Sequence, residues 1–138
     1  MRLPPFSLER FFAAHEFEAP HLLCVSDCET CAVQELLDAA PGAQEDLLSL
    51  RLGYTDSRGH PELRAAIAGL YQDADPEEIL VHSGAEEAIF GFMHAALTPG
   101  DRVLVQSPCY QSLAQVAGSL GCEVMPWPTR LSPEGDRW

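Results

Sequence analysis

The sequence predicts an α/β fold in which a parallel sheet is built from consecutive βαβ units. Three short apolar runs, at 79–82, 102–106 and 122–125, have the length and composition of buried strands. The segments between them, 85–97 and 110–120, repeat apolar residues at i, i+3, i+4 and i+7, which is the spacing of one buried helix face. Strands that alternate with helices pair in parallel through right-handed crossovers, and we expect helices to cover both faces of the sheet.

Glycine and proline residues mark the ends of these elements, because both interrupt regular backbone structure. The breaks lie at Ser83-Gly84, Pro99-Gly100, Pro108 and Gly121. The stretch from Ile79 to Tyr110 therefore forms one complete strand–helix–strand unit, and the rest of the chain is arranged around it.

The part of the chain before this unit contains shorter predicted elements. They are an amphipathic helix over 7–17, a short strand over 22–26, helical turns over 34–40 and a helix over 61–71. His60 can cap the last of these helices, and Pro61 suits its first position. The acidic stretch 73–78 and the proline-rich tail 126–138 are predicted to be loops.

The turn at Ser83-Gly84 is a candidate anion site. A strand that turns through glycine into a helix leaves the first helical N–H groups unpaired, with the positive end of the helix dipole behind them. Such a place binds phosphate. Ser83 and Glu86 also have the spacing of a capping box, in which their side chains satisfy the same donors without a ligand. The spacing by itself favours the cap.

The composition restricts the partners of the protein. The 138 residues carry a formal net charge of −13, and all eight basic residues are arginines, so the sequence contains no lysine. Nucleic acid and anionic membranes both favour clustered basic residues, and we expect neither as a partner. The sequence starts without a signal-like apolar segment and contains no run long enough to span a membrane. We therefore expect a cytoplasmic protein with reduced cysteines.

Three of the five cysteines, Cys24, Cys28 and Cys31, have the C-x3-C-x2-C spacing with which radical S-adenosylmethionine enzymes hold an iron–sulfur cluster. That family usually has an aromatic residue before the third cysteine, where this chain has Thr30, and no glycine-rich strand end follows. Cysteine also packs as a small apolar residue. We predict no metal at these cysteines, with the cluster as the alternative. Cys109 and Cys122 are predicted to be buried.

Five short segments occur in a specific order along the chain. They are Leu52–Gly59, Leu63–Ile67, Val81–Ile89, Pro99–Asp101 and Ser107–Tyr110. In this order they resemble the N-terminal third of class I/II aminotransferases, which are pyridoxal-phosphate enzymes of fold type I. The resemblance spans about Leu47 to Met125. It implies the start of a fold type I large domain over 46–138, preceded by an N-terminal arm or small-domain segment over 1–45.

The resemblance also implies the residues that bind pyridoxal 5'-phosphate. The backbone amides of Gly84, Ala85 and Glu86 match the phosphate loop of the family, and Tyr110 matches the aromatic residue that lies against the pyridine ring. Tyr54 matches the tyrosine that reaches the cofactor phosphate of the partner subunit across a homodimer interface. The alternatives are a ring in the core for Tyr110 and an ordinary turn residue for Tyr54. Because parallel strands end at the same edge, we expect the amides of Ala85 and Glu86 to face one cavity together with the Tyr110 ring.

The implied reaction transfers an amino group between an amino acid and a 2-oxo acid. The family's Schiff-base lysine has no counterpart in a chain without lysine, so we expect the chain to be inactive by itself and to be either a fragment or a truncated gene model. Capreomycidine-forming and related arginine-modifying enzymes also look similar, at Ser26–Glu29 and Ala85–Ile89. A lysine-free pseudoenzyme is a further alternative.

Overall fold

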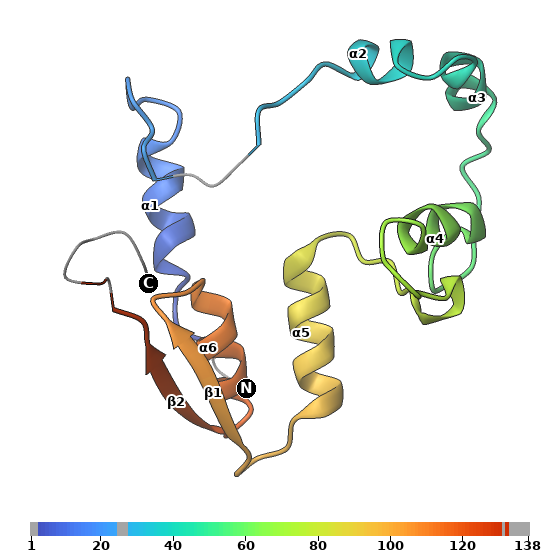
Figure 1. Ribbon diagram of the computed structural model, residues 1–138. Coiled ribbons are helices and arrows are strands. Elements are labelled where there is room, and N and C mark those ends of the chain that lie inside the picture. Colours follow the sequence, from blue (N-terminus) through green and yellow to red (C-terminus); the bar gives the residue numbers. More distant parts are fainter. Residues whose placement is uncertain (1–2, 25–27, 131, 133–138) are drawn as a thin grey trace. The chain divides into compact units, whose positions relative to one another are not determined.

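The computed structural model describes residues 3–24, 28–130 and 132. In chain order its elements are α1 (Ser7–His15), α2 (Val33–Asp38), α3 (Ala43–Ser49), α4 (Pro61–Ala68), the 3-10 helix η1 (Pro76–Glu78), α5 (Ala85–Ala96), β1 (Arg102–Ser107), α6 (Gln111–Ser119) and β2 (Glu123–Pro128) (Figure 1). The chain divides into two compact units. The first combines 1–19 with 82–138, and the second is 20–81.

The first unit contains a two-stranded parallel sheet. β1 pairs with β2 in a register that starts at Arg102 and Glu123 and ends at Ser107 and Pro128. α6 connects the two strands and packs on them, and α5 packs alongside α6 (Figure 1). The α/β fold, the parallel pairing of the last two predicted strands and both predicted helices are thus confirmed.

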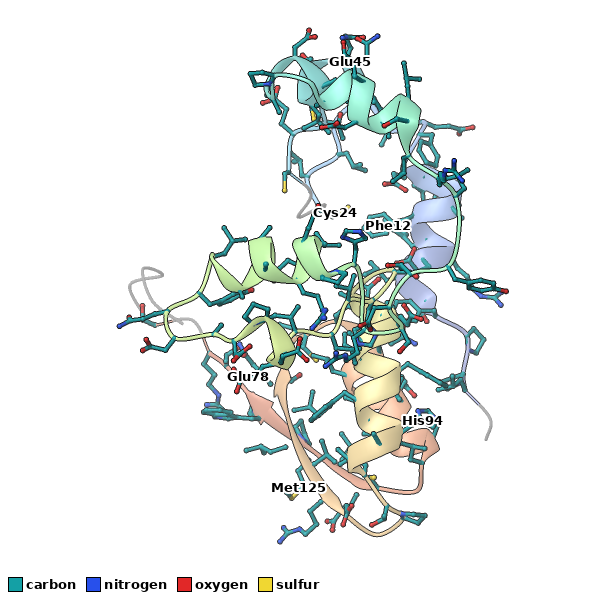
Figure 2. The ribbon with its side chains drawn as sticks, turned by 90° about the vertical axis from the view of Figure 1, so that its right-hand side faces the viewer. Phe12, Cys24, Glu45, Glu78, His94 and Met125 are labelled. Atoms are coloured by element: carbon teal, nitrogen blue, oxygen red, sulfur yellow. The ribbon has the colours of Figure 1, made fainter. Side chains whose placement is uncertain are left out.

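The core of this unit lies where α5, α6 and the sheet meet. Ala117 is completely buried, and Met93, Val116 and Cys122 are at most 9% exposed. The residues packed around them are Ile89, Leu97, Val103, Leu113, Leu120 and Val124. They include apolar positions from the predicted stripes of both helices. On α5, the ring centroids of His94 and Phe90 lie 3.9 Å apart (His94 is labelled in Figure 2).

Two predicted strands are not formed. Residues 79–82 have no strand pairing, and their one backbone bond to a distant residue is from the Val81 N–H to the Arg58 oxygen, at 2.8 Å. A strand needs a ladder of bonds to a neighbour, and the described residues provide no such neighbour here. Residues 22–24 are also irregular, and the rest of that predicted strand lies outside the described residues.

Three further differences concern elements that the sequence patterns did not predict. α3 was not expected, the 3-10 helix η1 lies in the predicted loop 73–78, and β2 continues into the proline-rich tail as far as Pro128. Proline cannot donate to a ladder, but β2 is at the edge of the sheet and needs no donor on its outer side.

We predicted that helices cover both faces of the sheet, and for the described residues this prediction is wrong. Val105, on the face toward α6, is buried, whereas Leu104 on the opposite face is 60% exposed. Trp127 on β2 is 62% exposed. Neighbouring residues of a strand point to opposite faces, so one layer of helices covers only alternate positions.

In the part of the chain that the structure describes, no helix has the length and apolarity needed to cross a membrane.

The second unit is organised by Arg64, on α4. Its side chain is 4% exposed, and its guanidinium donates to the carbonyl oxygens of Gly59 (3.2 Å) and Pro76 (2.8 Å) and to the Glu77 carboxylate (3.1 Å). These bonds join α4 to the loop before it and to η1. At the start of α4, the His60 Nδ1 accepts from the Glu62 N–H at 3.3 Å, so the predicted cap is confirmed.

The turn before β1 gives a prediction on pH dependence. The Asp101 carboxylate accepts from the N–H (2.7 Å) and the hydroxyl (2.9 Å) of Thr98, and these bonds hold the pKa of Asp101 below the usual 3.8. A lowered folded-state pKa stabilises the fold above the unfolded-state pKa, and this stability is lost as the pH falls through the folded pKa. Asp101→Asn should therefore weaken the acid dependence of the urea midpoint between about pH 6 and about pH 2. A midpoint that changes with pH equally in both proteins would contradict this role.

Candidate functional site

The start of α5 is open. Gly84 is the N-terminal cap, its backbone is extended (φ 166°, ψ 169°), and no side chain caps the helix there. A Cβ atom added at Gly84 would meet no atom within 4 Å. Among the described residues, no acceptor pairs with the N–H groups of Ala85 and Glu86. Backbone donors at a helix start with free space in front of them can hold an anion.

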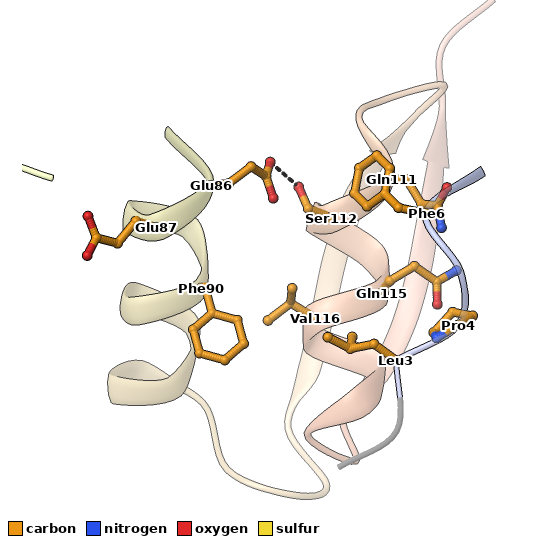
Figure 3. Close-up of a pocket in the computed structure, with 10 residues that line it drawn as sticks. All are labelled: Leu3, Pro4, Phe6, Glu86, Glu87, Phe90, Gln111, Ser112, Gln115 and Val116. Atoms are coloured by element: carbon orange, nitrogen blue, oxygen red, sulfur yellow. Dashed lines mark hydrogen bonds between the residues drawn. The ribbon is translucent and has the colours of Figure 1, made fainter. Parts of the chain in front are cut away.

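The capping box predicted for Ser83 and Glu86 is not formed. The Glu86 carboxylate accepts instead from the Ser112 hydroxyl on α6, at 2.8 Å (Figure 3). Glu87 accepts from the Ser83 N–H at 2.5 Å, and this bond lowers the pKa of Glu87. The physical reason is that the extended Gly84 is the capping residue, which leaves Ser83 one position outside the helix. The two carboxylates are thus held by other partners, and the first helical N–H groups stay available.

Tyr110 lies directly before α6 and is 39% exposed. Its hydroxyl donates to the Glu9 carboxylate at 2.6 Å, and its ring packs against that of Phe6, with the centroids 5.2 Å apart. The bond to Glu9 raises the pKa of Tyr110 to about 12, and partial burial and the charges of Glu9 and Glu86 act in the same direction. Tyr110 is therefore a neutral, oriented ring at any physiological pH.

Gln111, the first residue of α6, holds the N-terminal segment. Its Oε1 accepts from the Ser7 N–H at 2.9 Å, and its Nε2 donates to the Pro5 carbonyl oxygen at 3.0 Å. The sequence patterns indicated neither this contact nor the bond between Glu9 and Tyr110. More than 100 residues separate the partners in both cases, and no local signal connects them.

A cavity of about 420 Å³ lies beside these residues (Figure 3). Its walls come from the N-terminal segment, α5 and α6, and include Phe6, Glu86, Phe90 and Val116. Neither Ala85 nor Tyr110 lines this cavity, and the expectation that the amides of Ala85 and Glu86 face one cavity together with the Tyr110 ring stays a prediction. The ring of Phe6 lines the cavity instead and packs against Tyr110.

Tyr54 belongs to the second unit, and its side chain is fully exposed. The turn that follows it is held by Asp56, whose carboxylate accepts from the Arg58 N–H at 2.8 Å. This bond is the main reason why the pKa of Asp56 is lowered. The structure therefore brings Gly84, Ala85, Glu86 and Tyr110 together in the first unit, while Tyr54 is part of the second.

The cysteines do not form a metal site among the described residues. Cys24, Cys28 and Cys31 are exposed free thiols, and residues 25–27 between them lie outside the described part of the chain. No group of three potential metal ligands occurs in the described residues. That these cysteines hold no metal stays a prediction. Cys122 is buried as predicted, whereas Cys109 is exposed.

The start of α5 fits the phosphate group of pyridoxal phosphate through its backbone. The N–H groups of Ala85 and Glu86 and the space above Gly84 provide donors and room. The side chains of the first turn provide no positive charge, since Glu86 and Glu87 are both acidic. At this helix start, the groups that can hold an anion are therefore backbone N–H dipoles and not side-chain charges.

Residues 21–136 match the family described as aminotransferase class I and II. The arginine–pyruvate transaminase of Pseudomonas aeruginosa is 33% identical over 114 residues, which cover 79% of this chain and 28% of that enzyme. The capreomycidine synthase of Streptomyces vinaceus is 31% identical over 130 residues, which cover 93% of this chain and 33% of that enzyme. The chain thus spans about a third of the length of these relatives.

The fold agrees with this match. A crystal structure of a pyridoxal-phosphate-dependent aminotransferase from Streptococcus suis superposes with a TM-score of 0.84 at 29% identity. The superposition covers 95% of this chain and 36% of that one. Both the sequence and the structure assign the same relationship: the chain belongs to the class I and II aminotransferase family.

Proposed function

We propose that this chain is the N-terminal, cofactor-binding part of a pyridoxal-phosphate-dependent aminotransferase, which transfers an amino group between an amino acid and a 2-oxo acid. The observation that carries the proposal is the open helix start at Gly84, in the same unit as the oriented ring of Tyr110. When bound, pyridoxal phosphate supplies an aldehyde that condenses with amines and a ring that accepts electrons. Residues 46–138 are the start of the cofactor-binding domain in this proposal, and residues 1–45 precede it.

Each proposed site residue has one task. The N–H groups of Gly84, Ala85 and Glu86 hold the phosphate, and the missing side chain of Gly84 leaves room for it. The flat ring of Tyr110 lies against the pyridine ring and fixes its plane. Tyr54, whose hydroxyl is free to reach outward, contacts the cofactor phosphate bound by the second subunit of a homodimer.

This chain lacks the lysine amine that would react with the cofactor. The chain contains no lysine, and we propose that it is inactive by itself because no lysine ε-amine is present to form the Schiff base or to carry the proton at the substrate carbon. Sequencing the gene beyond the codon of Trp138 tests this. An open frame that encodes a Ser-x-x-Lys-like segment supports an aminotransferase fragment, whereas an immediate stop codon favours the lysine-free pseudoenzyme.

A second candidate reaction keeps the cofactor and changes the product. The match to capreomycidine synthase extends over 93% of this chain, so a capreomycidine-synthase-like cyclase or an arginine-modifying enzyme is the alternative. The two reactions differ in their use of a 2-oxo acid, which transamination consumes and cyclisation does not. In both cases we propose a cytoplasmic enzyme with small-molecule substrates and without a nucleic-acid or membrane partner.

The phosphate site can be tested by replacing Gly84 with alanine. The extended backbone at Gly84 suits any residue and an added Cβ would meet no atom within 4 Å, so the variant should fold, and we expect its methyl group to compete with the phosphate for this open space. We expect the affinity for pyridoxal phosphate to fall about tenfold, or about 1.4 kcal/mol. The measurement is a titration of the 138-residue chain followed by the amide NMR signals of Ala85 and Glu86, with inorganic phosphate as a second probe.

Two control variants make this test specific. Gly91→Ala adds a methyl group in the middle of the same helix, also into open space, and should leave the affinity unchanged. Glu86→Gln should change the affinity little, because the backbone amide of this residue does the binding. If Gly84→Ala binds as the unchanged chain does, the start of α5 is only a helix start, and the proposed phosphate site is wrong.

A further inference from the structure

We propose that Gln111 is a positioning residue, which fixes residues 5–7 on the start of α6 so that Phe6 and Glu9 hold the ring of Tyr110. The inference rests on the proposed function, in which Tyr110 lies against the cofactor ring. It adds to that function a contact between the first residues of the chain and the site.

Gln111 uses both ends of its side-chain amide. Its oxygen accepts from the Ser7 N–H, and its NH₂ group donates to the Pro5 carbonyl oxygen. Ser7 begins α1, and the side chain of the cap residue Phe6 makes no hydrogen bond to the first N–H groups of that helix. Gln111 therefore satisfies one of the donors that a helix start leaves unpaired.

The two bonds run in opposite directions and bracket Phe6. Oε1 of Gln111 accepts from the residue after Phe6, and Nε2 donates to the residue before it. The segment that carries Phe6 is therefore held against the first residue of α6 on both sides of Phe6 (Figure 3).

This alignment decides what touches Tyr110. Phe6 lies between the two anchored residues, and its ring meets the Tyr110 ring at an interplanar angle of 50°. Glu9 follows in the first turn of α1 and accepts from the Tyr110 hydroxyl. One neighbour thus fixes the ring and the other fixes the hydroxyl, which leaves the Tyr110 side chain little rotational freedom.

A ring that must lie against a planar cofactor gains from being oriented before the cofactor binds, because less rotamer entropy is then lost on binding. Tyr110 is 39% exposed, so core packing alone does not impose its orientation. The contacts of Gln111, Phe6 and Glu9 take that role.

The test is made by NMR on the 138-residue chain without cofactor. In the unchanged chain we expect nuclear Overhauser contacts between the Phe6 and Tyr110 rings and between the Gln111 NH₂ group and Pro5. The Tyr110 phenol should titrate near 12. In Gln111→Ala we expect the contacts between the Phe6 and Tyr110 rings and the slow exchange of the Ser7 amide to be lost, and the Tyr110 titration to move toward the ordinary value of 10.0.

Two further variants separate positioning from general stability. Gln115→Ala removes the same side chain one turn later on α6, at a residue that lines the same cavity but makes no hydrogen bond to the N-terminal segment among the described residues. It should leave all signals unchanged. Glu9→Gln should lower the pKa of Tyr110 while the contacts between the Phe6 and Tyr110 rings persist.

The inference is wrong if Gln111→Ala keeps the ring contacts and the titration of the unchanged chain. It is also wrong if the unchanged chain lacks the contact between Gln111 and Pro5, a measurement that needs no variant to fold. Neither result depends on pyridoxal phosphate. A chain with all these contacts that fails to bind pyridoxal phosphate would count against the proposed function and leave the role of Gln111 in place.

Discussion

Replacing Arg64 with methionine is expected to destabilise the second unit by about 3 kcal/mol. Methionine retains much of the apolar stem but loses the guanidinium, so the carbonyl oxygens of Gly59 and Pro76 lose their donor. The Arg64 side chain is 4% exposed, and water therefore has little access to replace these bonds. The amide of Val81, which donates to Arg58 within this unit, is a suitable reporter, and its hydrogen exchange should become roughly a hundredfold faster.

A matched control for this variant is Arg58→Met. Arg58 also pairs with Glu77, at 2.6 Å, but its side chain is 45% exposed, so solvent screens the interaction. We expect exchange at Val81 to change little. Equal effects of the two variants would show that the buried bonds of Arg64 are not what holds the unit together.

Replacing Gly59 with alanine is the second change with a large expected effect, a loss of at least about 2 kcal/mol. Gly59 has φ +112°, which residues with a side chain rarely adopt, and an added Cβ would lie 2.7 Å from the Cβ of Val81. The loop would have to move, which would also disturb the bond from Arg64 to the Gly59 oxygen. Faster exchange of the Val81 amide and a lower urea midpoint would report the effect.

Gly69→Ala provides the control, because Gly69 ends α4 with φ −63° and ψ −12° and has ordinary contacts around an added Cβ. Alanine there should be neutral or slightly stabilising, since it restricts the unfolded chain. If Gly59→Ala were as well tolerated, the close approach of Gly59 to Val81 would not be a constraint on the fold.

Both large effects concern the turn that follows Tyr54. Asp56, Gly59 and Arg64 hold this turn on α4, while Tyr54 itself stays exposed just before it. If Tyr54 contacts a cofactor in a second subunit, a rigid turn would reduce the entropy lost on contact. The variants therefore also provide a way to loosen the Tyr54 segment without changing Tyr54.

The sequence by itself determined the elements that short-range patterns encode. The apolar stripes of α5 and α6, the breaks at Pro99-Gly100 and Gly121, and the cap at His60 all depend on residues within a few positions of each other. A helical period and a backbone break are local physical properties, and for this reason they could be predicted. The ordered segments that indicated the family are local patterns as well.

The tertiary structure decided which distant residues become the hydrogen-bonding and packing partners of each element. Residues 79–82 have the composition of a strand but no ladder partner among the described residues, and a strand exists only with its partner. Glu86 has the spacing of a capping residue, yet its carboxylate pairs with Ser112 on another helix. Tyr110 was predicted as a site residue, but its contacts with Phe6 and Glu9 join positions about 100 residues apart. Such pairings depend on how the folded elements pack, because the energy of a contact depends on distance in space and not on distance along the chain.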